Sequence, residues 1–150
     1  MKSVAVIVVV ALTFFSSGCG TGVGNALHSG TDFSSAHSDL STVQIMNAMC
    51  SKIISCHGGP NNCSAEIQQV QTIDTEIGLT ADAYINYNAV IAADFSKDIL
   101  ANTKATNDCV TDLDNLACDD TAVQNAYQPG DAQPFAQVAD ILPVSCQGVF

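Results

Sequence analysis

The cysteines are the residues best able to do chemistry in this chain of 150 residues, which contains seven of them. Covalent haem attachment needs two residues between its paired cysteines, so that both thioethers reach one porphyrin, whereas residues 51–55 separate Cys50 from Cys56. A structural zinc site made of Cys50, Cys56, His57 and Cys63 would need closely paired ligands and thiolates that stay reduced. The spacing favours neither, and we predict no metal or cofactor at these positions.

The densest group of carboxylates comprises Asp108, Asp112, Asp114, Asp119 and Asp120. An EF-hand loop starting at Asp112 would need a ligand and a central glycine where this chain has Leu116 and Ala117. We therefore expect a solvated helix face and turn here, with weak calcium binding of another kind as the alternative.

Signals for catalysis are absent from the sequence. It has no nucleophile elbow, no metalloprotease His-Glu-x-x-His and no Cys-x-x-Cys. Asp74 and Glu76 are two positions apart, so they would not face each other on a helix. The chain has no arginine, four lysines and a formal net charge of -11, which disfavours binding to phosphates of nucleic acids. We predict no catalytic residues and no nucleic-acid partner.

Residues 1–18 have the three regions of a secretory signal peptide. Lys2 supplies a positive charge, residues 4–15 form an almost wholly apolar run, and Ser16, Ser17 and Gly18 follow as a tract of small residues. The apolar run is shorter than the roughly 20 residues that span a bilayer. We expect this segment to be removed from the mature protein.

Cys19 comes directly after this tract, and Ser16-Ser17-Gly18-Cys19 resembles the lipobox of bacterial lipoproteins. The resemblance covers only the signal and Cys19, and it departs from the family at Ser16, where leucine is usual. It implies that Cys19 carries diacylglycerol and fatty acyl chains such as palmitate, which would anchor the protein to a membrane. Glycine at position 20, rather than aspartate, further implies the outer membrane.

Six cysteines remain if Cys19 carries lipid, and an oxidising compartment favours three disulfides among them. Six cysteines allow fifteen connectivities. Cys50 and Cys56 are too far apart on one helix to bond to each other. The turn over residues 57–62 favours Cys56–Cys63, and spacing along the rest of the chain favours Cys118–Cys146 and Cys50–Cys109.

Residues 19–40, rich in glycine and serine, are expected to form the lipidated N-terminus and a flexible tether. From Ser41 onward, apolar residues such as Met46, Met49 and Ile53 recur at intervals of three and four, which is the period of a helix. The expected helices cover residues 41–57 (capped by Ser41 and stopped by Gly58), 64–77 (ended by Gly78), 80–95 (capped by Thr80, with a continuation past Ile99 as the alternative) and 106–117, followed by short turns over 121–127 and 134–142. In the helix over 106–117, we expect Cys109, Leu113 and Leu116 to face inward. No segment after the signal alternates as a strand does.

The fold class that we predict is an all-α, irregular helical bundle cross-linked by disulfides, spanning residues 41–150. Its expected function is that of a membrane-anchored extracytoplasmic structural or interaction lipoprotein without catalytic activity, whose partner is an envelope or surface protein or a glycan. The alternative is a small-molecule or metal-binding carrier with an interhelical pocket lined by Tyr84, Tyr87, Phe95 and the acidic residues. Helical spacing makes the two tyrosines more typical of a core.

Overall fold

The computed structural model describes residues 37–71 and 73–150, which form helices joined by turns and contain no strand. The prediction of an all-α fold cross-linked by disulfides is confirmed. The expected signal peptide, Cys19 and most of the expected tether lie outside the described residues. The elements are α3 (Ser41–His57), α4 (Cys63–Ile67), η1 (Asp74–Ile77), α5 (Tyr87–Ser96), α6 (Thr103–Asn115), α7 (Thr121–Ala126), η2 (Val138–Ile141) and η3 (Val144–Gly148), where η denotes a 3-10 helix.

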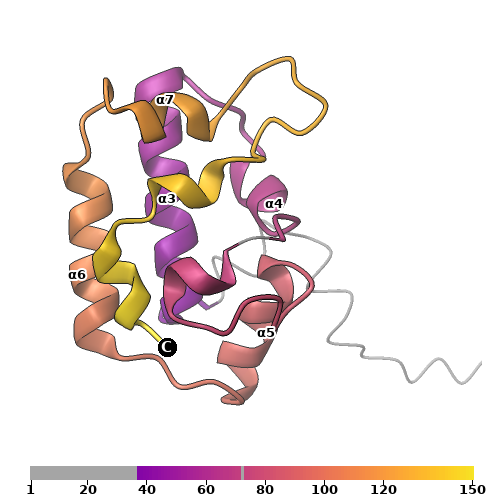
Figure 1. The fold of residues 1–150 in the computed structure, drawn as a ribbon, viewed down its shortest axis with the longest axis vertical. Coiled ribbons are helices and arrows are strands. Elements are labelled where there is room, and N and C mark those ends of the chain that lie inside the picture. Colours follow the sequence, from indigo (N-terminus) through magenta and orange to yellow (C-terminus); the bar gives the residue numbers. More distant parts are fainter. Residues whose placement is uncertain (1–36, 72) are drawn as a thin grey trace, which may run out of the picture.

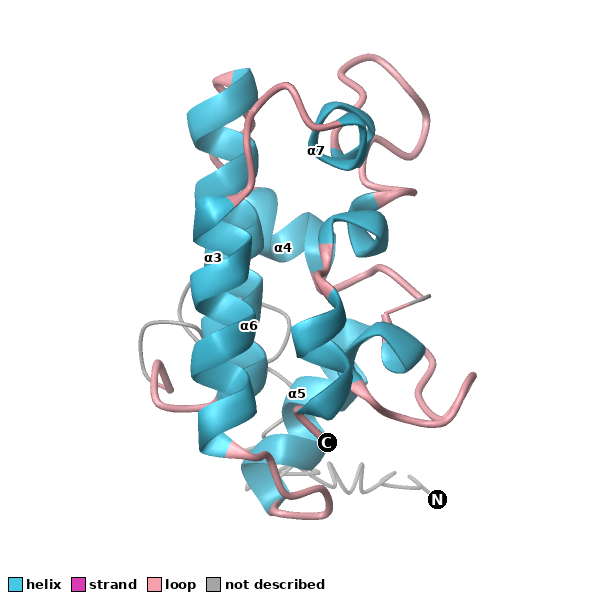
Figure 2. Cartoon of the chain, turned by 60° about the vertical axis from the view of Figure 1, so that its left-hand side comes forward, coloured by secondary structure: helices cyan, strands magenta, loops and turns pink. Residues whose placement is uncertain are grey.

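Helices α3 and α6 form the long axis of the molecule and run in the same direction (Figures 1 and 2). Near their N-terminal ends, the Thr106 hydroxyl donates to the Ser41 hydroxyl at 2.9 Å. Near their C-terminal ends, the Lys52 ammonium donates to the carbonyl oxygen of Leu116 at 2.8 Å. The shorter helices pack around this pair, with α4 and α5 on one side and α7 at its C-terminal end (Figure 1).

Helix α3 begins at Ser41 and ends before Gly58, as the sequence predicts, but Ser41 does not cap it. Leu40 occupies the N-cap position and makes no side-chain cap bond. The carboxylate of Asp94, from α5, instead accepts a hydrogen bond from the backbone N–H of Thr42 at 3.1 Å. Gly58 ends the helix with a left-handed φ of 66°, a conformation that glycine adopts without a steric penalty.

The prediction of one helix over residues 64–77 is wrong. Helix α4 ends at Ile67, and the separate 3-10 helix η1 begins only at Asp74. Between them, the backbone carbonyl of Val70 accepts from the N–H of Tyr87 at 2.9 Å, and that of Gln68 accepts from Asn88 at 3.0 Å. These bonds to the start of α5 replace the helical bonds that the sequence period suggested.

The next helix starts later than the sequence predicts. Thr80 does not cap it; Asn86 does, because its side chain accepts from the backbone N–H of Ala89 at 3.0 Å. Residues 80–86 form turns, and the N–H of Tyr84 donates to the buried carboxylate of Asp74 at 2.9 Å. A tertiary contact therefore holds this stretch outside the helix.

Helix α6, by contrast, begins three residues before the predicted start, because the side chain of Asn102 accepts hydrogen bonds from two backbone N–H groups of its first turn. Cys109 and Leu113 face the core as expected. The 3-10 helix η3 was not predicted. It brings the C-terminal residues back against η1 and the start of α6, where the carbonyl of Val149 accepts from the N–H of Asn102 at 2.7 Å.

The core lies between α3 and the elements around it. Its largest fully buried side chains come from α3 and from the elements packed around it, and all but Tyr87 and Gln68 are aliphatic residues or methionines. They are Ile45, Met46, Met49, Ile53, Ile67, Gln68, Ile73, Ile77, Tyr87, Ile91, Leu113 and Ile141. Among the described residues, no helix combines the length and the apolar character needed to cross a bilayer.

Candidate functional site

All six cysteines of the described residues form disulfides, in pairs that differ from the three predicted ones. Cys50 bonds to Cys63, Cys56 to Cys118, and Cys109 to Cys146. The expectation that Cys50 and Cys56 do not pair with each other is confirmed. The predicted pairs Cys56–Cys63, Cys118–Cys146 and Cys50–Cys109 are wrong.

The direction of each side chain on its helix explains the first correction. Six residues of α-helix turn the chain through about 600°, so the side chains of Cys50 and Cys56 point about 120° apart around α3. Helix α4 packs on the face that carries Cys50, and its first residue, Cys63, meets that side chain. Cys56 points to the turn after α6 and bonds to Cys118 there.

The position of η3 explains the other two corrections. Cys146 lies in η3, which packs along α6, and it meets Cys109 on the buried face of that helix. Cys118 lies beyond the C-terminal end of α6, where it bonds to Cys56 of the last turns of α3, whereas η3 packs along α6 itself. Cys50, which α4 covers, does not face Cys109.

The aromatic and acidic residues that the sequence offered as pocket lining do not come together as one. Tyr87 is buried, and its hydroxyl donates to the carbonyl oxygen of Thr42 at 2.7 Å. Burial, and then the negative charge of Asp94, raise the pKa of Tyr87 well above its ordinary value, so this phenol stays protonated. Tyr84 is half-buried, and Phe95 is 42% exposed, with its ring against that of His37.

Three of the five acidic residues make contacts at a helix end or on the surface. Asp108 pairs with Lys104 one turn earlier on α6, Asp112 accepts from the Ser145 hydroxyl at 2.7 Å, and Asp120 caps α7. Asp112 and Asp114 lie within α6, so they do not form a calcium loop. The described part of the chain contains no group of three or more His, Cys, Asp or Glu side chains placed to hold a metal ion.

Three further polar side chains that are buried or half-buried have structural partners, whereas the buried Oδ1 of Asn88 accepts no hydrogen bond from the described residues. The Asp94 carboxylate accepts from both the backbone N–H and the hydroxyl of Thr42. The Lys52 ammonium donates to the carbonyl oxygens of Asp114 and Leu116, where the last turn of α6 leaves carbonyls without helical partners. His57 shares a hydrogen bond of 2.9 Å with the carbonyl of Val123. These groups hold helix ends and leave no acid or base aimed at a cavity.

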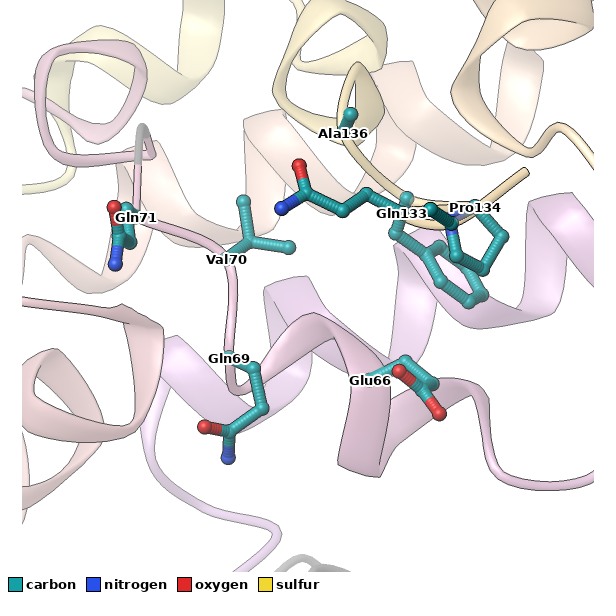
Figure 3. Close-up of a pocket in the computed structure, with 9 residues that line it drawn as sticks. Glu66, Gln69, Val70, Gln71, Gln133, Pro134 and Ala136 are labelled. Atoms are coloured by element: carbon teal, nitrogen blue, oxygen red, sulfur yellow. The ribbon is translucent and has the colours of Figure 1, made fainter.

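The candidate site is a hollow of about 330 Å³ between the segment 66–71 and the loop that follows α7. Its lining combines one carboxylate, three glutamine amides and a set of small or apolar side chains, namely Glu66, Gln69, Val70, Gln71, Ala132, Gln133, Pro134, Phe135 and Ala136. Figure 3 shows the Gln133 side chain reaching from the loop toward Val70, with Glu66 and Gln69 on the side opposite Ala136. No sequence pattern predicts this site, because its two walls are some sixty residues apart and glutamine has no diagnostic spacing.

The hollow has fixed walls and free polar groups. The backbone of Val70 is held from both sides, because its N–H donates to the carbonyl oxygen of Ile67 and its own carbonyl oxygen accepts from the N–H of Tyr87. Phe135 is 4% exposed and lies against the Tyr127 ring, with 5.1 Å between ring centroids. The amides of Gln69, Gln71 and Gln133 make no hydrogen bond to other described residues, so they are available to a ligand.

Comparisons with protein-family models, with curated proteins and with solved structures find no match to this chain. The three disulfides are of the kind that forms and persists outside the cytoplasm, which indicates an extracytoplasmic location.

Proposed function

We propose that this protein is a lipid-anchored module of the cell envelope, held in the outer membrane through Cys19, which binds an envelope or surface component and catalyses no reaction. The observation that carries this proposal is the pairing of all six cysteines after residue 40. Because the chain has seven cysteines, the one left over is Cys19, and it stands where a lipobox places its lipidated residue.

The disulfides support export, because such bonds persist in oxidising compartments. The buried polar side chains support a binding role over catalysis, since each of Asp94, Lys52 and Tyr87 is occupied with a helix end. The hollow with its free amides gives such a module a place to bind.

The experiment that tests the anchor is Cys19→Ala in the full chain, expressed in a bacterium that processes lipoproteins. We expect the unchanged protein in the membrane fraction and in the detergent phase, and the variant in the aqueous phase, because two or three acyl chains give stable anchoring. Ser16→Leu is the matched control. It alters the same tract toward the usual lipobox and should keep the protein in the membrane.

Alkylation without reduction checks the rest of the proposal in the same samples. We expect no labelled cysteine in the unchanged protein and the same disulfides in Cys19→Ala, which shows that loss of anchoring is not loss of folding. Detergent partitioning that Cys19→Ala leaves unchanged would overturn the lipid anchor, and two or more labelled cysteines would contradict the cystine-linked fold.

A further inference from the structure

The hollow between residues 66–71 and 132–136 has a lining whose chemistry selects for a neutral, hydroxyl-rich ligand. We propose that it binds a neutral saccharide. This inference rests on the proposed envelope-binding role and names the class of ligand. Each glutamine amide both donates and accepts hydrogen bonds, as each sugar hydroxyl does, so Gln69, Gln71 and Gln133 can satisfy hydroxyls in either direction.

Charge argues against an ionic ligand at this site. No lysine lines the hollow, and the chain as a whole carries a formal charge of -11, so a phosphate or carboxylate ligand would meet no cation and a repulsive field. Glu66 is the one carboxylate of the lining, and the Asn62 amide already donates to it at 2.9 Å. A cationic ligand would therefore meet only one anionic side chain, which already accepts a hydrogen bond.

The apolar side chains at the floor of the hollow suit the C–H groups of a sugar ring. A pyranose ring presents C–H groups on its faces and hydroxyls around its edge. Val70, Pro134 and Phe135 supply apolar surface between the amides, which is the combination of apolar lining and a few placed polar groups that defines ligand pockets. In Figure 3, Gln133 extends above Val70 with its amide free to meet a hydroxyl at the edge of such a ring.

The size and rigidity of the hollow fit one or two sugar units. Its volume of about 330 Å³ is at the lower end of the roughly 300–1,000 Å³ typical of ligand pockets. Because the backbone of Val70 and the ring of Phe135 are fixed by other elements, the apolar floor needs no reordering when a ligand binds. The exposed rim at Gln69, Gln71 and Gln133 leaves room for a longer chain to continue into solvent.

The test is a titration of the full-length protein, labelled with ¹⁵N at its glutamine side chains, in a zwitterionic detergent that carries no sugar. Cellobiose, maltose and diacetylchitobiose are the neutral probes, and methyl glucoside and glucuronate form a pair that differs in charge. We expect at least one neutral disaccharide to shift the side-chain signals of Gln69, Gln71 and Gln133 with a dissociation constant on the order of 1 mM. Glucuronate should bind more weakly than methyl glucoside.

Three variants locate the effect. Gln133→Ala removes one hydrogen-bonding amide and should weaken binding about three- to tenfold. Ala136→Trp, at an exposed position of the rim, should fill the hollow and abolish the shifts while the other signals stay those of the folded protein. Gln147→Ala, at an exposed glutamine of η3 that does not line the hollow, should leave the affinity unchanged.

Several outcomes would overturn the proposal. These are no shift with any neutral disaccharide, equal binding of glucuronate, binding that Ala136→Trp leaves intact, or tighter binding of a neutral Gly-Asn-Gly-Ser peptide at the same signals. If saccharide binding fails while Cys19→Ala still releases the protein from membranes, only the ligand class is wrong. If binding succeeds while the anchor fails, the saccharide site stands without the membrane location.

Discussion

At each end of the α3 and α6 pair, a buried charged side chain binds the backbone of a helix end, and the two charges have opposite signs. At the N-terminal end, the anion of Asp94 meets the first turn of α3, and this carboxylate is 3% exposed. At the C-terminal end, the cation of Lys52 meets the last carbonyls of α6. Both charges complement the helix dipole, which is positive at the N-terminus and negative at the C-terminus.

Two of the disulfides, Cys109–Cys146 and Cys56–Cys118, differ in how deeply they are buried. Cys109–Cys146 has no exposed surface on either cysteine, and it ties α6 to the C-terminal segment. Cys56–Cys118 joins the far ends of α3 and α6, where Cys56 is half-buried and Cys118 is exposed. Cross-links with similar effects on chain entropy therefore differ in how much they add to the packing of the core and in how well they are protected from solvent.

The largest predicted effect is the loss in free energy of unfolding when either of these two disulfides is removed. Chain entropy alone predicts a loss of about 4 kcal/mol for either, because the bridged cysteines are 37 and 62 positions apart. Cys109→Ala with Cys146→Ala also leaves a cavity in the core, which costs about 1–2 kcal/mol more. Urea unfolding of both double variants measures the difference, and equal losses would show that burial adds nothing.

Reduction of the unchanged protein provides a control without mutation. Under limiting dithiol reductant, alkylation and peptide mapping should find Cys56 and Cys118 labelled before any other cysteine, since access governs thiol–disulfide exchange. Earlier labelling of Cys109 would contradict the contrast between the two disulfides.

The second effect in size concerns the buried anion. Asp94→Ala leaves the N–H and hydroxyl of Thr42 without an acceptor, and it should destabilise the protein by about 3 kcal/mol. Asp94→Asn keeps an acceptor oxygen and should cost about 1 kcal/mol. Asp98→Ala, at an exposed carboxylate just after the same helix, is the control and should change little. Thermal unfolding followed by circular dichroism gives the ranking, and an alanine variant no worse than the asparagine one would remove the capping role.

The smallest effect concerns the cation at the other end. Lys52→Met keeps the aliphatic stem but removes the donor to the carbonyls of Asp114 and Leu116, and it should cost about 2 kcal/mol. Lys104→Met, at an exposed lysine paired with Asp108, should have almost no effect. Amide hydrogen exchange should show faster opening of the last turn of α6 in Lys52→Met. Unchanged exchange there would mean that the ammonium does not hold this helix end.

The sequence predicted the class of fold and most of the buried face. The period of three and four placed Met46, Met49 and Ile53 on one side of α3, and all three are buried. Glycines at positions 58 and 78 marked ends correctly, because a left-handed residue stops a helix through local backbone geometry alone. Such local signals are readable without knowledge of neighbours.

Local signals in the sequence did not predict where the helices start or where the candidate site lies. Ser41 is a good capping residue by type, yet the acceptor that serves α3 comes from Asp94, which is distant in sequence. The break after Ile67 depends on hydrogen bonds from Tyr87 and Asn88, which a periodic pattern does not contain. The hollow forms because Gln133 lies against the segment 66–71, which is some sixty residues earlier in the sequence.

The cysteines separate the two kinds of information most clearly. From the sequence alone it follows that the number of cysteines is odd, that six of them lie between residues 41 and 150, and that Cys50 and Cys56 are too far apart on one helix to bond to each other. Which cysteine each of them bonds to depends on the tertiary structure. The reason is physical: a disulfide requires Cα atoms about 4.4–6.8 Å apart, and that separation is set by how helices pack, which local sequence does not encode.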